Sequence, residues 1–119
     1  MNNPAKDKSL SLGVQIIKLA RRIQKEEKEY IVSRQILKSG TSIGANIRES
    51  QNAQSKADFV SKLTIALKEA DETQYWLELM MLSELISETE YNDLLKDLKE
   101  IIAILTSSVK TAKQNIANK

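Results

Sequence analysis

The sequence predicts an all-α protein, an antiparallel up-down-up-down four-helix bundle. Apolar residues recur every three or four positions along four separate segments, which is the period of one helix face. The 119 residues include only three glycines and one proline, far fewer than a turn-rich β-sandwich or barrel needs. The connection before the last segment is very short, and short connections place successive helices antiparallel. The length fits a single domain.

The first helix is expected over about residues 9–25, after a disordered tail of residues 1–8. Asp7 or Ser9 is placed to accept a hydrogen bond from the first turn as its N-cap. The charged run of residues 25–29 has no apolar member, so it is either an exposed connection or the frayed end of this helix. The apolar face consists of Leu12, Ile16, Leu19, Ala20 and Ile23.

The second helix is expected over about residues 30–52, with Val32, Ile36, Ile43 and Ile47 on one face. Gly40 and Gly44 interrupt this pattern, and each glycine costs a helix about 1 kcal/mol relative to alanine. A loop is one interpretation of the two glycines. We favour a continuous helix, because the helical spacing persists on both sides, and the pair then lets a neighbouring helix approach closely.

The third and fourth helices are expected over about residues 56–86 and 88–115. Ser55 and Ser87 each begin a capping-box pattern, with an acidic residue three positions later. The run from Tyr75 to Leu82 is apolar nearly all round, with Glu78 as its single charge. Such a helix must be buried on more than one side. We therefore expect copies of the chain to pack together, with Trp76 in a subunit contact.

The composition excludes much enzyme chemistry. The chain contains no cysteine and no histidine, so it has no thiolate or imidazole metal ligand and no Ser–His–Asp triad. A Ser–Lys dyad stays open, although no motif indicates one. Glu49, Glu69 and Glu72 are the candidates for a carboxylate metal site, but bundle di-iron sites use histidine as well. We expect no metal, no cofactor and no enzymatic activity.

Polar residues lie along the edge of the expected core. Ser42, Asn46 and Glu49 flank the apolar face of the second helix, and Glu69 and Glu72 share one face of the third. Because buried polar groups must be hydrogen-bonded, a network between these two sets would fix the register of the helices. The alternative is that they are simply exposed.

The net charge of the chain is +2, but the first half is basic and the second half is acidic. Residues 1–62 carry twelve lysines and arginines against six acidic residues, and residues 63–119 carry six against ten. The basic residues form one stripe on each of the first two helices, and adjacent stripes would merge into a surface that attracts phosphate. The members are Lys18, Arg21, Arg22, Lys25, Arg34, Lys38 and Arg48. We expect no aromatic side chain to interleave these cations, and therefore no stacking platform for single strands. The stripes are alternatively a solvated outer face, or a face that meets the acidic half of another copy.

Three runs of sequence resemble one known family. They are residues 42–50 (SIGANIRES), 55–59 (SKADF) and 67–77 (LKEADETQYWL), and the likeness extends over roughly residues 30–105. The chain resembles the bacterial four-helix bundle family first known from intervening sequences inside 23S ribosomal RNA genes. That family also includes the accessory variability protein of diversity-generating retroelements.

The resemblance implies an antiparallel four-helix bundle and a ring-shaped homopentamer. In the retroelement branch it also implies a basic ring that binds nucleic acid and a reverse transcriptase, whereas this chain is only weakly basic. By position, Ser42, Asn46, Glu49, Glu69 and Glu72 match the family's polar positions, which we interpret as structural or interface residues.

We expect a cytoplasmic protein without a membrane segment, since no apolar run reaches the length of a membrane span and the first residues lack a signal-peptide pattern. The first hypothesis for function is a non-enzymatic homo-oligomeric scaffold that contacts RNA, DNA or a nucleoprotein through its basic surface. The second is a protein-interaction module without a nucleic-acid role, and the third is a carboxylate metalloenzyme.

Overall fold

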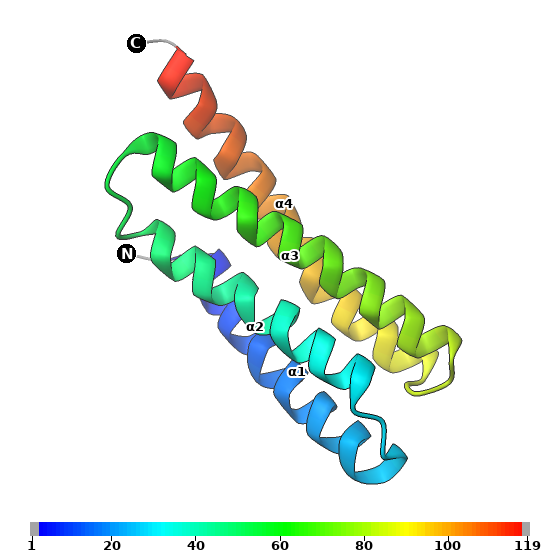
Figure 1. Ribbon diagram of the computed structural model, residues 1–119. Helices are drawn as coiled ribbons and strands as arrows, with labels where there is room; N and C mark the ends of the chain where they lie inside the picture. Colours follow the sequence, from blue (N-terminus) through cyan, green and yellow to red (C-terminus); the bar gives the residue numbers. More distant parts are fainter. Residues whose placement is uncertain (1–2, 118–119) are drawn as a thin grey trace.

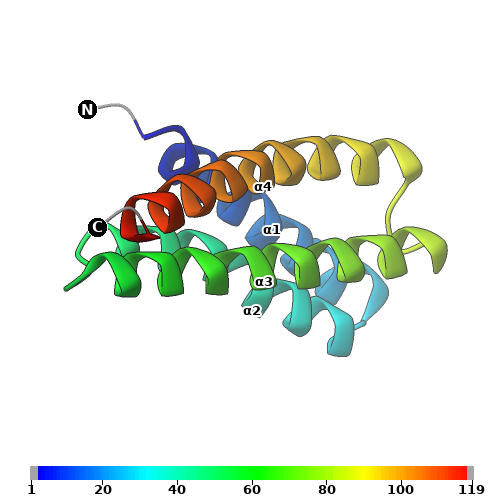
Figure 2. The same ribbon diagram turned by 90° about the horizontal axis from the view of Figure 1, so that it is seen from above.

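The computed structural model describes residues 3–117, whose regular secondary structure is entirely helical. Helix α1 spans Pro4–Glu27, α2 Ile31–Ser50, α3 Lys56–Leu82 and α4 Glu88–Ala117. Figure 1 shows α1 and α2 as one antiparallel pair and α3 and α4 as a second pair. Contacts join α1 to α2, α2 to α3, α3 to α4 and α4 back to α1. The predicted all-α four-helix bundle is confirmed, as a rod of 53 × 24 × 22 Å whose long direction follows the helices (Figure 2).

The first helix begins five residues earlier than the sequence analysis predicted. The side-chain oxygen of Asn3 accepts a hydrogen bond from the backbone N–H of Lys6 at 3.0 Å. Pro4 then takes the first helical position, where the N–H that proline lacks has no helical partner anyway. The prediction that Asp7 or Ser9 is the cap was therefore wrong, and residues 4–8 are helical rather than part of a disordered tail. Residues 1 and 2 of that expected tail lie outside the described residues.

The connection from α1 to α2 is short and well defined. Lys28 ends α1 in the left-handed region, with φ at 55°. The Glu29 carboxylate accepts hydrogen bonds of 2.8–2.9 Å from the N–H groups of the first three residues of α2. A carboxylate at this place satisfies N–H groups that have no helical partner and interacts favourably with the helix dipole. The charged run of residues 25–29 was expected to be an exposed connection or a frayed helix end. One of its members, Glu29, caps α2.

Two glycines of α2 set how closely α1 approaches. Helix α2 continues through both glycines, as predicted. A Cβ added at Gly40 would lie 2.9 Å from Cγ2 of Ile16, and one added at Gly44 would lie 3.3 Å from Oγ of Ser9. Because Ile16 is fully buried, no side chain fits at Gly40 unless the core moves. The backbones of α1 and α2 can pack closely because these two positions carry no side chains.

The other two connections use serine caps. Ser55 accepts from the backbone N–H of Asp58 at 3.0 Å, and Ser87 from that of Glu90 at 3.1 Å. The third helix ends at Leu82, four residues before the predicted end, because Glu84 adopts a φ of 65° and the chain turns there. One apolar core runs through all four helices; its fully buried members include Leu12, Ile16, Ile36, Ile43, Leu77, Met80, Leu98, Ile101 and Leu105.

Candidate functional site

All seven cations predicted as a nucleic-acid surface occupy exposed positions on α1 and α2. Within residues 3–117, the ion pairs of the structure include only Arg22 from this set. The other six are Lys18, Arg21, Lys25, Arg34, Lys38 and Arg48. Burial of unpaired charge is costly, so their exposure is what physical chemistry requires. It also leaves them available to an anionic partner.

The register of α1 against α2 determines which cations share one end of the bundle. Gln24 Nε2 donates to Ser33 Oγ at 3.1 Å, and Ile16 faces Gly40. These contacts place residues 18–25 of α1 alongside residues 33–38 of α2, next to the connection that joins the two helices (Figure 1). We call the five cations at this end the hairpin cluster; they are Lys18, Arg21, Lys25, Arg34 and Lys38.

One aromatic side chain accompanies this cluster. The guanidinium of Arg34 lies over the Tyr30 ring, 5.7 Å from its centroid, and the ring is 42% exposed. Such a contact holds the cation by the negative face of the ring. The expectation that no aromatic interleaves the cations was wrong, because Tyr30 lies between Lys25 and Arg34 in the chain and contacts Arg34.

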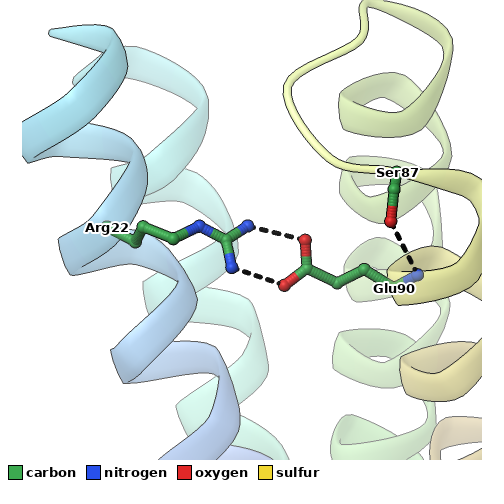
Figure 3. A network of polar contacts seen from close by, with 3 residues as sticks. All are labelled: Arg22, Ser87 and Glu90. Carbon is green, nitrogen blue, oxygen red and sulfur yellow. Dashed lines mark hydrogen bonds and ion pairs between the residues drawn. The ribbon is translucent and has the colours of Figure 1, made fainter.

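Arg22 differs from the other six cations, because a carboxylate of α4 already binds it. Its two terminal nitrogens donate to the two oxygens of Glu90 at 2.7 and 2.6 Å (Figure 3). The hydrogen bonds from Arg22 to Glu90 raise the pKa of the guanidinium above its ordinary value. Glu90 is also the residue whose N–H donates to the Ser87 cap, so the pair ties α1 to the first turn of α4. Arg22 is therefore a helix-to-helix contact of this bundle.

Arg48 lies at the opposite end of α2, beside an apolar groove between the outer sides of α1 and α2. The groove has a volume of about 390 Å³. Leu10 and Val14 line it with exposed fractions of 57% and 45%. Gly13 and Gly44 also line it, and their lack of side chains helps to hollow it. We call this the α1–α2 groove; the rest of its lining is Lys6, Ser9, Ile17, Thr41, Ala45 and Arg48.

The outer side of α3 carries a second exposed apolar surface. Tyr75 is 56% exposed and Leu82 is 68% exposed, while Leu77 and Met80 between them are buried in the core. Asp71 and Glu78 are exposed on the same side. The spacing 71, 75, 78 and 82 places these four residues on one helix face. We call them the α3 ridge: Asp71, Tyr75, Glu78 and Leu82.

The comparisons with known proteins agree on the family. The family model described as 23S rRNA-intervening sequence protein matches residues 1–107. The chain belongs to the 23S rRNA-intervening sequence protein family. A solved structure, that of a protein of unknown function from the S23 ribosomal protein family of Bacteroides thetaiotaomicron, is 53% identical with a TM-score of 0.88. The match covers 89% of this chain and 98% of that one. No curated protein matches.

The resemblance seen in the sequence is thus confirmed for the family and the fold. The 23S rRNA-intervening sequence family name refers to where such sequences occur, and it assigns no reaction or ligand to this chain. No helix among the described residues has both the length and the apolar character to cross a membrane.

Within residues 3–117, the two sets of polar side chains considered for a network between α2 and α3 make other contacts. Asn46 donates to the Ser42 backbone carbonyl within α2 at 2.9 Å, and Glu49 lies 3.6 Å from Lys62. Within residues 3–117, no hydrogen bond joins Asn46 or Glu49 to Glu69 or Glu72. The structure therefore gives no support to a link between these two sets of side chains; Asn46 bonds within α2, Glu49 pairs with Lys62, and Glu72 accepts from Trp76.

A buried polar contact between α2 and α3 is one that sequence reasoning missed. The Thr73 hydroxyl lies 2.9 Å from Ser39 Oγ, and both residues are buried. Each also lies near a carbonyl of its own helix, Glu69 for Thr73 and Ile36 for Ser39. The available signal was that Ser39 falls at core spacing on α2 and Thr73 within the seam of α3.

Trp76 is half-buried against the core rather than fully exposed. Its indole N–H donates to Glu72 at 3.2 Å, and its ring meets Tyr75 edge-on, with centroids 4.8 Å apart. The subunit contact expected for Trp76 stays a prediction, and the more exposed aromatic of the pair is Tyr75. Among the described residues, no group of three or more acidic side chains could hold a metal ion.

Proposed function

We propose that this chain is a non-enzymatic, homo-oligomeric helical scaffold whose hairpin cluster contacts RNA, DNA or a nucleoprotein. The observation that supports it is the gathering of five exposed cations at one end of α1 and α2, none in an ion pair within residues 3–117. Cations in this state attract phosphate without reading base sequence, and their binding releases counterions. The ring-shaped homopentamer implied by the resemblance would repeat the cluster around one assembly.

The second candidate function is a protein-interaction module without a nucleic-acid role. The α1–α2 groove favours it, since an exposed apolar groove suits a protein partner better than a phosphate backbone. The two functions predict different responses to salt, because only phosphate binding releases condensed counterions.

The test measures binding of fluorescently labelled RNA and DNA of mixed sequence between about 50 and 200 mM salt. The informative variant is Arg21→Glu with Arg34→Glu, both in the hairpin cluster. Arg22 is left intact, because a glutamate there would face Glu90 and disturb the bundle. The matched control is Lys110→Glu with Lys113→Glu, which makes the same change in net charge on exposed positions of α4.

We expect wild-type affinity to fall steeply with salt and the cluster variant to lose most binding. Each lost phosphate contact should reduce the slope of log affinity against log salt by about 0.9 on duplex DNA. The control should retain both affinity and slope. Absence of binding at about 50 mM salt, or an equal loss in both variants, would remove the hairpin cluster as a nucleic-acid surface and favour the second function.

A further inference from the structure

The connection between α1 and α2 carries unburied apolar surface beside the hairpin cluster. Tyr30, the residue just before α2, is 42% exposed, and Ile31, the first residue of α2, is 77% exposed. Neither side chain belongs to the apolar core or to the residues packed against it. The Tyr30 side chain does not cap α2 either, because the Glu29 carboxylate accepts the first N–H groups of that helix. An aromatic ring and an aliphatic side chain thus lie next to the cations, and neither the core nor the cap uses them.

We infer that Tyr30 and Arg34 form a stacking site for an unpaired base, so that the hairpin cluster recognises single-stranded RNA or DNA. This inference rests on the proposed function and names the class of nucleic acid. Tyr30 and Arg34 stack against the base, while Arg21, Lys25 and Lys38 meet the phosphates on either side of it.

Tyr30 and the cluster cations of α2 lie on one side of that helix. The spacing 30, 34 and 38 places Tyr30, Arg34 and Lys38 in one row, with about 6 Å of rise between successive members. The guanidinium of Arg34 lies 5.7 Å from the centroid of the Tyr30 ring, as this spacing requires. The register of α1 against α2 brings the cluster cations of α1 alongside the same end of α2 (Figure 1). A base on the ring therefore has cations within reach of its flanking phosphates.

The ring and the guanidinium are the two kinds of side-chain surface on which unpaired bases stack. In this chain they are in contact with each other, and both side chains are exposed. Every base has a π-face, so such a site tolerates any base sequence, as the phosphate contacts of the cluster also do. In a duplex the bases are already stacked on one another, and the same site would meet only the backbone. A contact through the cations alone would leave Tyr30 and Ile31 without a role.

The acidic residues at this end of α1 and α2 leave the side of Tyr30 basic. Glu29 is engaged by the three N–H groups that it caps. Glu26 lies about 140° around α1 from Arg21, and it lines a cleft on the side that faces the α3–α4 connection, where Glu84 also lies. Glu27 is the remaining acid among residues 18–38, against the five cations of the hairpin cluster. An anionic strand therefore approaches from the side of the cluster, away from the acidic cleft.

The experiment measures binding of the full chain to three fluorescently labelled probes. They are a single strand of mixed sequence, the same strand paired with its complement, and a strand of equal length whose sugar–phosphate backbone carries no bases. Tyr30→Ala removes the ring, and Tyr30→Phe retains it. The matched control is Tyr75→Ala, which removes an exposed tyrosine from α3. Circular dichroism verifies that each variant is folded, as expected from the exposure of both tyrosines.

We expect Tyr30→Ala to lower the affinity for the single strand by about 5–150-fold, which corresponds to the loss of one stacked base. Tyr30→Phe and Tyr75→Ala should bind this strand as wild type does. On the duplex and on the base-free strand, Tyr30→Ala should match wild type, because these probes meet only the cations. The salt dependence should be unchanged throughout, since the tyrosine side chain carries no charge. Wild type should itself bind the single strand more tightly than the base-free strand by the same factor.

Four results would overturn the inference. An equal loss on all three probes would show that Tyr30 only positions Arg34. Unchanged affinity of Tyr30→Ala for the single strand, or equal affinity of wild type for the single and base-free strands, would show that the ring meets no base. A loss in Tyr30→Phe as large as in Tyr30→Ala would assign the effect to the hydroxyl. These three leave the hairpin cluster as a phosphate-binding surface, whereas absence of binding to every probe at about 50 mM salt would refute the proposed function as well.

Discussion

Substituting Gly40 with alanine tests the close approach of α1 and α2 directly. An added Cβ would lie 2.9 Å from Cγ2 and 3.0 Å from Cγ1 of Ile16. Carbon atoms in favourable contact are about 3.5–4.0 Å apart, so the methyl group overlaps the isoleucine by more than half an ångström. Ile16 branches at Cβ, which restricts its rotamers, and it is fully buried, so it cannot turn out toward solvent.

Two opposing terms set the size of the effect. Alanine stabilises a helix interior by about 1 kcal/mol relative to glycine. Forcing an extra methyl group into a packed core costs about 1–3 kcal/mol. We expect the packing term to exceed the helix term, so that Gly40→Ala lowers the free energy of unfolding by about 1 kcal/mol.

Gly13 provides the matched control, because it is also a glycine within a helix but has no atom within 4 Å of its added Cβ. Gly13→Ala should therefore raise the free energy of unfolding by about 1 kcal/mol. Urea unfolding followed by circular dichroism, at two protein concentrations to separate assembly from folding, measures both changes. The two alanines should have opposite signs.

Ile16→Ala removes the atoms that Gly40→Ala would meet, so the sign should reverse in that background. Ile16→Ala alone should cost about 2–5 kcal/mol, and adding Gly40→Ala to it should recover about 1 kcal/mol. If Gly40→Ala stabilises wild type as much as Gly13→Ala does, the helices are farther apart than the structure places them and the reasoning fails.

Three further changes test single features of the fold. Thr73→Val should cost about 1 kcal/mol in urea unfolding, and adding Ser39→Ala should cost less than the sum of the two single changes, because removing both hydroxyls leaves neither without its partner; additive values would show that the two do not interact. Lys28→Gly should raise the melting temperature by about 4 °C, since φ is 55° there and glycine adopts this region without strain; a fall would contradict the left-handed cap. The hydrogen bond from Lys8 lowers the pKa of Glu100, so the folded state binds fewer protons there; the stabilisation is present above the ordinary value of 4.5 and is lost as the pH falls through the lowered pKa. The melting temperatures of wild type and Glu100→Gln should thus differ at about pH 7 and converge at about pH 3, by a small amount because the pair is exposed; a difference that persists in acid would exclude the ion pair as its source.

Most of the fold was predictable because its determinants are periodic along the chain. The spacing of Leu12, Ile16 and Ile23 defines a helix face before any tertiary contact is known, and all three residues are buried. The start of α1 was missed because apolar periodicity begins later than the helix does. The helix begins at the Asn3 cap and Pro4, and neither residue belongs to the apolar pattern on which the prediction was based.

The candidate site was less predictable, because pairing partners depend on the rotation of each helix about its axis. Arg22 and Arg21 are adjacent in sequence, but 100° of helical rotation turns Arg22 toward Glu90 while Arg21 keeps no ion pair within residues 3–117. Arg48 is separated from the hairpin cluster by its position along α2, about 15 Å beyond Lys38, where it lines the groove. Charge counting alone treats all seven cations alike.

The hairpin cluster and the α1–α2 groove lie at different places on the α1–α2 pair. Residues 18–25 and 33–38 lie at the connection end of α1 and α2, and the groove, whose lining includes Lys6 and Arg48, extends toward the other end. A partner bound in the groove would therefore leave most of the cluster accessible. The homo-oligomer that we propose would present several clusters to one strand, and linked sites gain about 10²–10⁴ in affinity without any new type of contact.

Strand length tests whether the proposed oligomer presents several hairpin clusters at once. On a strand long enough to span two subunits, wild-type affinity should exceed the affinity for an oligonucleotide that reaches one subunit by about 10²–10⁴. The variant Arg21→Glu with Arg34→Glu should lose this gain together with most of its salt dependence, because it lacks two cations of every cluster. Equal affinity on long and short strands would mean that only one cluster contacts nucleic acid at a time.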